Sequence, residues 1–335
     1  MKHIYLLGLL IFSISCEDNI EQNDANELLI VASEGNFGSS NGSLSVFKGK
    51  EKIQTIDDIG DVVQSITTYN NKLFVVVNNS HLIKVFTITE SGLKLPGIDI
   101  STNNSSPREL IVHNNKAYFT NYNSQDVKVL DLETYYIEKS IKVNGLPESI
   151  VSDGKYLWVA INMNSDYSSA SKVVKIDPEN NQVTKTYEVG KGPQQLLIEN
   201  NNLWISRTFY SQDFTETYFG TSLINIISDD IKIMNYGTGT VCGGDLMNFD
   251  GIIHRTFDGG VAPLNTSLNI EKLGKIGNFK KQELYSANAF EDKLYMGITS
   301  DYISPDTVFV HDKTGQVINT FTVGAAPGDF AIWKE

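Results

Sequence analysis

Cysteine is almost absent from this chain, which contains only Cys16 and Cys242 among its 335 residues. Two cysteines cannot build a disulfide-stapled scaffold, so an ordinary apolar core must hold the fold. Proline and glycine number 8 and 26, which excludes collagen-like and low-complexity chains. After residue 16, no apolar run is long enough to cross a bilayer as a helix.

Basic residues are also scarce, with 27 Lys and Arg against 40 Asp and Glu and a net charge of −13. No cluster of Lys and Arg supplies the basic stripe that a nucleic-acid-binding surface requires. The five histidines stand far apart and show no metal-ligand spacing. The composition therefore indicates a globular protein that binds no nucleic acid, and it predicts neither a metal nor a cofactor.

The first residues are typical of a targeting signal. Lys2 precedes an apolar run over residues 4–12, and small residues follow it up to Cys16. This order predicts a signal peptide over residues 1–15. The segment ending at Cys16 resembles a bacterial lipobox, which implies that Cys16 is lipidated and becomes the first mature residue. The alternative is a soluble secreted protein in which Cys16 is incidental.

Residues 16–27 contain five acidic residues and no basic residue. Such a segment cannot bury apolar surface, so it predicts a solvated tether. Acids directly after the cysteine resemble the surface-export signal of bacteroidete-type lipoproteins. The resemblance implies a protein that is anchored in the outer membrane by its lipid alone and exposed on the cell surface.

The rest of the chain repeats with a period of about 45 residues. A polar turn followed by an apolar strand recurs seven times, with spacings of 45, 44, 40, 46, 49 and 42 between the anchors; these anchors are Leu28, Leu73, Ala117, Leu157, Leu203, Ile252 and Leu294. One unit reads as four short strands, at residues 109–113, 117–121, 127–132 and 137–143. Four strands in each unit of this length are typical of a β-propeller blade.

The two ends of the repeat region complete each other. The first copy begins at its second strand, residues 28–33, and an unmatched first strand over residues 329–333 ends the chain. Pairing these two strands would close the ring and leave no open sheet edge. Residues 28–335 are therefore predicted to form one all-β, seven-bladed propeller, closed by the C-terminal strand in the N-terminal blade.

Two segments carry a family resemblance. Residues 117–131, with Ala117-Tyr118-Phe119-Thr120-Asn121 at their start, resemble the YVTN type of propeller repeat. Residues 34–45 resemble the opening of bacteroidete surface lipoproteins that include the cobalamin-binding BtuG proteins. The second resemblance implies capture of cobalamin or another corrinoid and its transfer to a TonB-dependent outer-membrane transporter.

Catalytic patterns are weak in this sequence. Residues 38–42 fit G-x-S-x-G, but an alternating strand follows instead of a helix, so we interpret them as a hairpin loop. Carboxylates near the inner strands could serve a propeller hydrolase, and they are Asp61, Glu109, Glu148, Asp245 and Asp329. They recur at equivalent repeat positions, which favours a role in packing or turns. We therefore expect no enzyme activity.

Long connections between the second and third strands suggest a binding face. The expected long loops cover residues 34–43, 162–171, 207–221, 257–265 and 299–306. Loops on one face of a rigid scaffold commonly carry binding residues. Aromatic and arginine side chains in or beside them are the predicted ligand-binding residues: Phe37, Arg108, Tyr122, Tyr167, Arg207, Tyr210, Tyr218, Phe219, Phe257 and Tyr302.

These expectations combine into one functional hypothesis. The chain is expected to be a surface lipoprotein that binds a bulky nutrient, with a corrinoid as first candidate and a siderophore as another, and passes it to an outer-membrane transporter. One alternative is a propeller that grips a partner protein and binds no small ligand. The other is a propeller hydrolase or lactonase.

Overall fold

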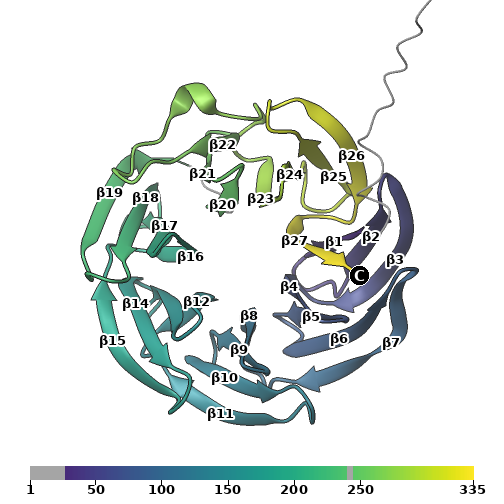
Figure 1. The fold of residues 1–335 in the computed structure, drawn as a ribbon, viewed down its shortest axis with the longest axis horizontal. Helices are drawn as coiled ribbons and strands as arrows, with labels where there is room; N and C mark the ends of the chain where they lie inside the picture. Colours follow the sequence, from purple (N-terminus) through teal and green to yellow (C-terminus); the bar gives the residue numbers. More distant parts are fainter. Residues whose placement is uncertain (1–26, 240–243) are drawn as a thin grey trace, which may run out of the picture.

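The computed structural model describes residues 27–239 and 244–335, which form a ring of seven antiparallel sheets around a central channel (Figure 1). The predicted all-β, seven-bladed propeller is therefore confirmed. The signal segment 1–15, the tether up to residue 26 and both cysteines lie outside the described residues, so the statements about them stay predictions. Within the described residues, no helix has the length and hydropathy needed to cross a membrane.

We number the blades along the chain, beginning with the one that contains the first described strand. Blade 1 contains, from the channel outward, β27 (Pro327–Lys334), β1 (Glu27–Ser33), β2 (Gly42–Lys48) and β3 (Glu51–Gly60). Blade 2 contains β4 (Val63–Tyr69), β5 (Lys72–Val77), β6 (Leu82–Thr89) and β7 (Gly92–Ser101). Blade 3 contains β8 (Pro107–His113), β9 (Lys116–Asn121), β10 (Asp126–Asp131) and β11 (Ile137–Lys142).

Blades 4 to 7 continue the same order. Blade 4 contains β12 (Leu146–Ser152), β13 (Leu157–Met163), β14 (Ser169–Asp177) and β15 (Gln182–Glu188), and blade 5 contains β16 (Pro193–Glu199), β17 (Asn202–Tyr210), β18 (Thr217–Asn225) and β19 (Ile231–Thr238). Blade 6 contains β20 (Leu246–Phe249), β21 (Ile252–Phe257) and β22 (Gly260–Pro263). Blade 7 contains β23 (Leu284–Phe290), β24 (Lys293–Ile298), β25 (Asp306–His311) and β26 (Val317–Val323).

Blade 3 illustrates why this sequence forms blades. Its four strands begin and end within two residues of the predicted positions. Between β8 and β9, Asn114 and Asn115 have φ angles of 47° and 59°. Asparagine tolerates this left-handed conformation better than most residues, and two such residues in succession suit a tight hairpin turn. The Asn-Asn pairs that punctuate the repeat are therefore turn residues.

Ring closure occurs as the sequence predicts. β27 pairs antiparallel with β1, with Ile332 opposite Leu29 and Trp333 opposite Leu28. Trp333 is buried and packs in a cluster with residues of blades 1 and 2, and its Nε1 donates a hydrogen bond to Asn71 Oδ1 at 3.3 Å. The last strand therefore fastens the first blade and also contacts its neighbour.

The apolar core is divided among the interfaces between neighbouring blades. One cluster joins Leu44 and Val46 of blade 1 to Val63 and Leu73 of blade 2, and each of these side chains is fully buried. Comparable clusters recur around the ring. Because the core lies between the blades, the inner strands can expose polar side chains to the central channel.

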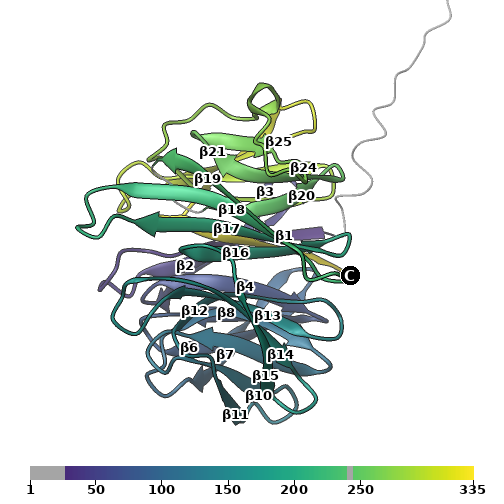
Figure 2. The ribbon, with the colours of Figure 1, turned by 90° about the vertical axis from the view of Figure 1, so that its left-hand side faces the viewer.

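Each blade has connections on two faces. The links from second to third strand and the links between blades lie on one face, which we call the loop face; the other links lie on the turn face. Figure 2 views the disc from its side, with the β17–β18 hairpin extending beyond its neighbours on the loop face. β1 starts at the turn face, so the described chain begins on the side away from the loops.

The structure corrects three expectations. Blade 6 has three strands, and residues 265–283, which include a short 3-10 helix at Lys272–Gly274, cover its outer edge in place of a fourth strand. The expected long loop over residues 207–221 is mostly the extended β17–β18 hairpin, because the alternating pattern continues to Tyr210. The expected loop over residues 257–265 is a tight turn at Asp258 and Gly259, since β22 begins at Gly260.

Candidate functional site

A cavity of about 970 Å³ occupies the mouth of the central channel on the loop face. All seven inner strands contribute to its wall, together with residues 34–37 and 301–303 from the loops of blades 1 and 7. Ligand pockets commonly measure about 300–1,000 Å³, so this volume suits a bulky small molecule. We call it the channel-mouth cavity.

At one equivalent position of the inner ring, side chains of six of the seven blades form a hydrogen bond with the next blade. Asp329 Oδ2 accepts the Ile66 N–H of the next blade at 2.8 Å. Glu109 Oε2 accepts the Ile150 N–H at 3.1 Å, and Asp245 Oδ2 accepts the Ala287 N–H at 2.7 Å. The seven equivalent inner-ring positions are Asp329, Ser65, Glu109, Ser149, Gln195, Asp245 and Ser286. The predicted packing role of Glu109, Asp245 and Asp329 is therefore supported by their geometry.

Burial changes the acidity of these channel carboxyl groups because it disfavours the charged form. Burial raises the pKa of Glu109 to about 8 and that of Asp245 to about 7. Burial likewise raises the pKa of Glu34 to about 7 and that of Asp329 to about 6. The cavity wall therefore changes its charge across the neutral pH range.

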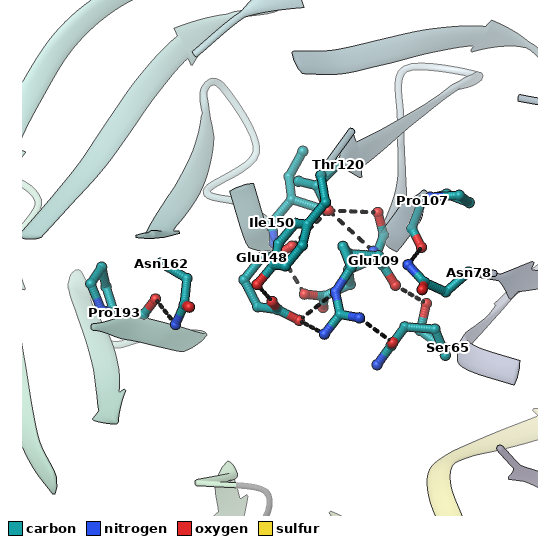
Figure 3. A network of polar contacts seen from close by, with 12 residues as sticks. Ser65, Asn78, Pro107, Glu109, Thr120, Glu148, Ile150, Asn162 and Pro193 are labelled. Carbon is teal, nitrogen blue, oxygen red and sulfur yellow. Dashed lines mark hydrogen bonds and ion pairs between the residues drawn. The ribbon is translucent and has the colours of Figure 1, made fainter. Parts of the chain in front are cut away.

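Arg108 and Glu148 form an ion pair beside this ring. Glu148 Oε1 accepts hydrogen bonds from Arg108 Nε at 2.9 Å and from Nη2 at 2.6 Å, and the Tyr122 hydroxyl donates to Glu148 Oε2. Burial lowers the pKa of Arg108, but Glu148, Tyr122 and Glu34 together outweigh it and the net shift is upward. Figure 3 shows Glu109 and Glu148 on adjacent inner strands, with the Thr120 hydroxyl donating to the Glu148 carbonyl at 2.6 Å and accepting the Glu109 N–H at 3.1 Å.

The same figure shows a repeated contact that fixes the start of an inner strand. The Asn78 Nδ2 donates to the Pro107 carbonyl at 2.9 Å, and the Asn162 Nδ2 donates to the Pro193 carbonyl at 3.2 Å (Figure 3). Both prolines are the first residues of their strands, where a missing N–H breaks no ladder bond. The wall of the channel-mouth cavity is thus held by side chains from the preceding blades.

The rim of the channel-mouth cavity is apolar and exposed. Phe37 and Ile303 are 79% and 70% exposed, and Tyr302 is 41% exposed. The two loops that carry them touch, since Asn36 Nδ2 donates to the Tyr302 carbonyl. Exposed apolar groups gathered beside a polar cavity are typical of a ligand-binding rim.

The other predicted residues divide into four groups by their position. Arg108 lies in the cavity wall with Phe37 and Tyr302, and the half-buried Tyr122 lies against it, 4.7 Å from its guanidinium carbon to the ring centroid. Tyr167 and Tyr210 are exposed on the loop face outside the cavity lining. The half-buried Tyr218 stacks on Phe209, with ring centroids 5.5 Å apart.

Arg207, Phe219 and Phe257 do not lie on an open rim as expected. Arg207 is 1% exposed and donates its hydrogen bonds to backbone and amide oxygens. Phe219 is 8% exposed, because β18 continues through it. Phe257 is half-buried and lines a second, smaller pocket together with Phe219.

Two further carboxylates from the sequence analysis differ in their positions. Glu148 lines the channel-mouth cavity, whereas Asp61 does not. The Asp61 carboxylate accepts the Gly38 N–H at 2.9 Å and a hydrogen bond from Asn79 Nδ2. Asp61 therefore fixes the hairpin loop at residues 34–41.

Sequence reasoning missed the amide and acid groups that complete the wall, namely Glu34, Gln64, Gln194, Gln195 and Asp301. Gln194 and Gln195 directly follow Pro193, just as Arg108 and Glu109 follow Pro107. The residue directly after each repeat proline could therefore have been identified as lining the cavity, since Arg108, Glu148, Gln194 and Gly328 all do so. In the described part of the chain, no group of His, Cys, Asp and Glu side chains is arranged to hold a metal ion.

Comparison with known proteins identifies the fold only. No protein-family model and no curated protein sequence matches this chain. A putative 6-phosphogluconolactonase from Bacteroides fragilis is 14% identical, with a TM-score of 0.64 over 93% of this chain and 99% of that one. A hypothetical selenium-binding protein from Sulfolobus tokodaii is 7% identical, with a TM-score of 0.69 over 92% and 93%.

A third similar structure is apo AztD from Citrobacter koseri, at 11% identity and a TM-score of 0.58 over 92% of this chain and 98% of that one. At these identities the similarity extends to the propeller architecture and carries no function. The functional argument therefore depends on the geometry of this chain.

Proposed function

We propose that this protein captures a bulky, partly polar small molecule in the channel-mouth cavity. The observation that carries the proposal is the cavity itself, with about 970 Å³ of space between a polar wall and an apolar rim. Gln64, Gln194 and the carboxyl groups of the wall can donate or accept hydrogen bonds, while Phe37 and Tyr302 supply flat contact area. This combination suits a ligand with both amide-like groups and apolar surface.

A corrinoid is the first ligand to test. The segment that resembles the cobalamin-binding BtuG proteins is residues 34–45, and its first four residues line the channel-mouth cavity. Corrinoids carry several carboxamide groups around a large flat ring, which matches the amide groups and the aromatic rim. A siderophore remains the second candidate.

We further propose that the protein is an outer-membrane lipoprotein on the cell surface, attached through Cys16 alone. The described chain begins on the turn face, so a membrane anchor upstream of residue 27 is compatible with a loop face that stays open to ligand. On the same hypothesis, a TonB-dependent outer-membrane transporter receives the ligand from the loop face.

Calorimetric titration of residues 27–335 with cyanocobalamin tests the ligand. We expect stoichiometric binding that weakens about fivefold or more in Phe37→Ala and Tyr302→Ala, since truncating an aromatic anchor at a binding site costs more than about 1 kcal/mol. Tyr136→Ala is the matched control, because Tyr136 is 70% exposed in a turn of blade 3 on the opposite face. A folded protein that gives no heat would exclude cobalamin, and a panel of siderophores would then test the cavity.

The proposal includes no catalytic step. Three of the acids in the cavity wall already hold backbone N–H groups of the next blade, at inner-ring positions 329, 109 and 245. These hydrogen bonds between blades explain why acids occupy the three positions, and no catalytic role is needed to explain them. Lactone turnover that disappears in Glu109→Gln, while the variant remains folded, would show the hydrolase alternative to be correct.

A further inference from the structure

A second hollow lies between blades 5 and 6 on the loop face. Its volume is about 240 Å³, and none of its lining residues lines the channel-mouth cavity. Aromatic rings form its wall, with the centroid of Phe219 lying 5.2 Å from that of Tyr236 and 6.3 Å from that of Phe257. We call it the blade-5/6 pocket.

A buried arginine lies behind this wall without a charged partner. Arg255 is 0% exposed, and its guanidinium carbon lies 5.3 Å from the ring centroids of both Phe219 and Tyr236. Its Nη1 donates to the Gly220 carbonyl at 2.7 Å, but its buried Nη2 has no hydrogen-bond partner. Burial lowers the pKa of Arg255, and the Tyr236 hydroxyl opposes this lowering more strongly than the more distant Asp245 carboxyl group does.

A second arginine repeats this anomaly next to the first. Arg207 is 1% exposed, and its Nε also lacks a hydrogen-bond partner. No ion pair within residues 27–239 and 244–335 includes either arginine. Burial lowers the pKa of Arg207 to about 10, and the nearby Arg255 adds to the effect. Buried charges in proteins are normally paired, so this pair of cations calls for an anion.

The rim of the blade-5/6 pocket is also positively charged. Lys281 lines it, and the Lys272 Nζ lies 5.9 Å from the Phe257 ring centroid. Asp258 is the one carboxylate among the lining residues, and its Oδ1 pairs with Lys281 at 3.0 Å while its Oδ2 lies 3.9 Å from Lys275. The two charged lining residues therefore balance each other, and the additional positive charge beside the pocket comes from Lys272 and Lys275, which lie outside its lining.

We propose that the blade-5/6 pocket binds a small organic anion, whose flat apolar part packs against Phe219 and Phe257 and whose acid group lies at Lys281. The buried charge of Arg255 behind the ring wall favours the anion from a distance, without contact. The pocket is smaller than about 300 Å³, the lower end for drug-sized ligands, which limits the ligand to about one ring and its acid group. The site is separate from the channel-mouth cavity and does not depend on the function proposed for it.

Benzoate is the probe, and benzyl alcohol is its neutral counterpart of similar shape. At low ionic strength, we expect benzoate to bind the protein at least about tenfold more tightly than benzyl alcohol does. This difference in affinity should shrink as salt is added. Isothermal titration, together with chemical shifts of the ligand ring, measures both affinities. Equal affinities for the two probes, or no binding of benzoate at millimolar concentrations, would overturn the proposal.

Variants locate the site. Lys281→Gln should weaken benzoate about fivefold and leave benzyl alcohol unchanged, whereas Phe257→Leu should weaken both. Lys275→Gln is the matched control, because Lys275 approaches the same Asp258 but does not line the pocket. Arg255→Gln should reduce the preference for the anion if the variant folds. Because the burial of Arg255 puts folding at risk, the comparison of Lys281→Gln with Lys275→Gln decides the outcome. Equal affinities of these two variants for benzoate would contradict the assignment.

Discussion

Replacing Glu109 by glutamine should stabilise the propeller at alkaline pH. Glu109 lies in the channel wall and accepts the Ile150 N–H at 3.1 Å. Glutamine has nearly the same shape, and its Oε1 can accept the same hydrogen bond. The substitution therefore removes a half-buried ionisable group while it preserves the contact between blades 3 and 4.

The magnitude follows from the shifted pKa. Burial raises the pKa of Glu109 from 4.5 to about 8. A carboxyl group with a raised pKa in the folded state contributes its full stability below pH 4.5, and that stability is lost as the pH rises through about 8. At about 1.4 kcal/mol for each pKa unit, the advantage of Glu109→Gln over the natural chain should grow by about 4 kcal/mol between pH 5 and pH 8.5.

Urea denaturation at several pH values measures this difference in the free energy of unfolding. Glu90→Gln, at an exposed turn between β6 and β7, provides a control that should show no comparable pH dependence. A difference between Glu109→Gln and the natural chain that stays constant from pH 5 to pH 8.5 would refute the reasoning. It would mean that water or movement of the inner strands relieves the buried charge.

Two further substitutions test the packing. Trp333→Ala should lower the free energy of unfolding by about 3–5 kcal/mol in urea titrations, because it empties a buried site at the closure of the ring; a loss below about 1 kcal/mol would contradict the importance of closure. Gly259→Ala should cost more than about 1 kcal/mol by the same measurement, since φ is +71° and a Cβ would lie 1.9 Å from the Phe279 carbonyl oxygen. Gly251→Ala has φ +75° but open space around its Cβ, so it should cost less.

The strands and their closure were predictable because their signals are local. Asn114 and Asn115 mark a turn by their own conformational preference, and the apolar residues that follow mark a strand. The missing outer strand of blade 6 was not predictable in the same way. Outer strands such as β15 are largely exposed and therefore carry little apolar pattern, so residues 265–283 look no different from a polar outer strand.

The site was only partly predictable, for a different physical reason. Phe37 and Tyr302 were identified because large aromatic side chains in polar loops are conspicuous. Arg207 was expected at the same rim, but the direction of its side chain depends on the register of β17 with β18, which places it inside blade 5. The predicted face therefore contains two hollows of different chemistry instead of one aromatic surface.

The inner ring explains how a repeated fold can hold a ligand in one orientation. Seven equivalent backbone positions surround the channel, but their side chains differ, with acids in blades 1, 3 and 6 and an amide, Gln195, in blade 5. The Arg108–Glu148 ion pair lies on one side of the cavity, at blades 3 and 4. A symmetric scaffold with an asymmetric lining gives a ligand different hydrogen-bond partners on each side. The three acids and the Arg108–Glu148 pair also connect neighbouring blades, so the shape of the cavity and the stability of the ring depend on common contacts.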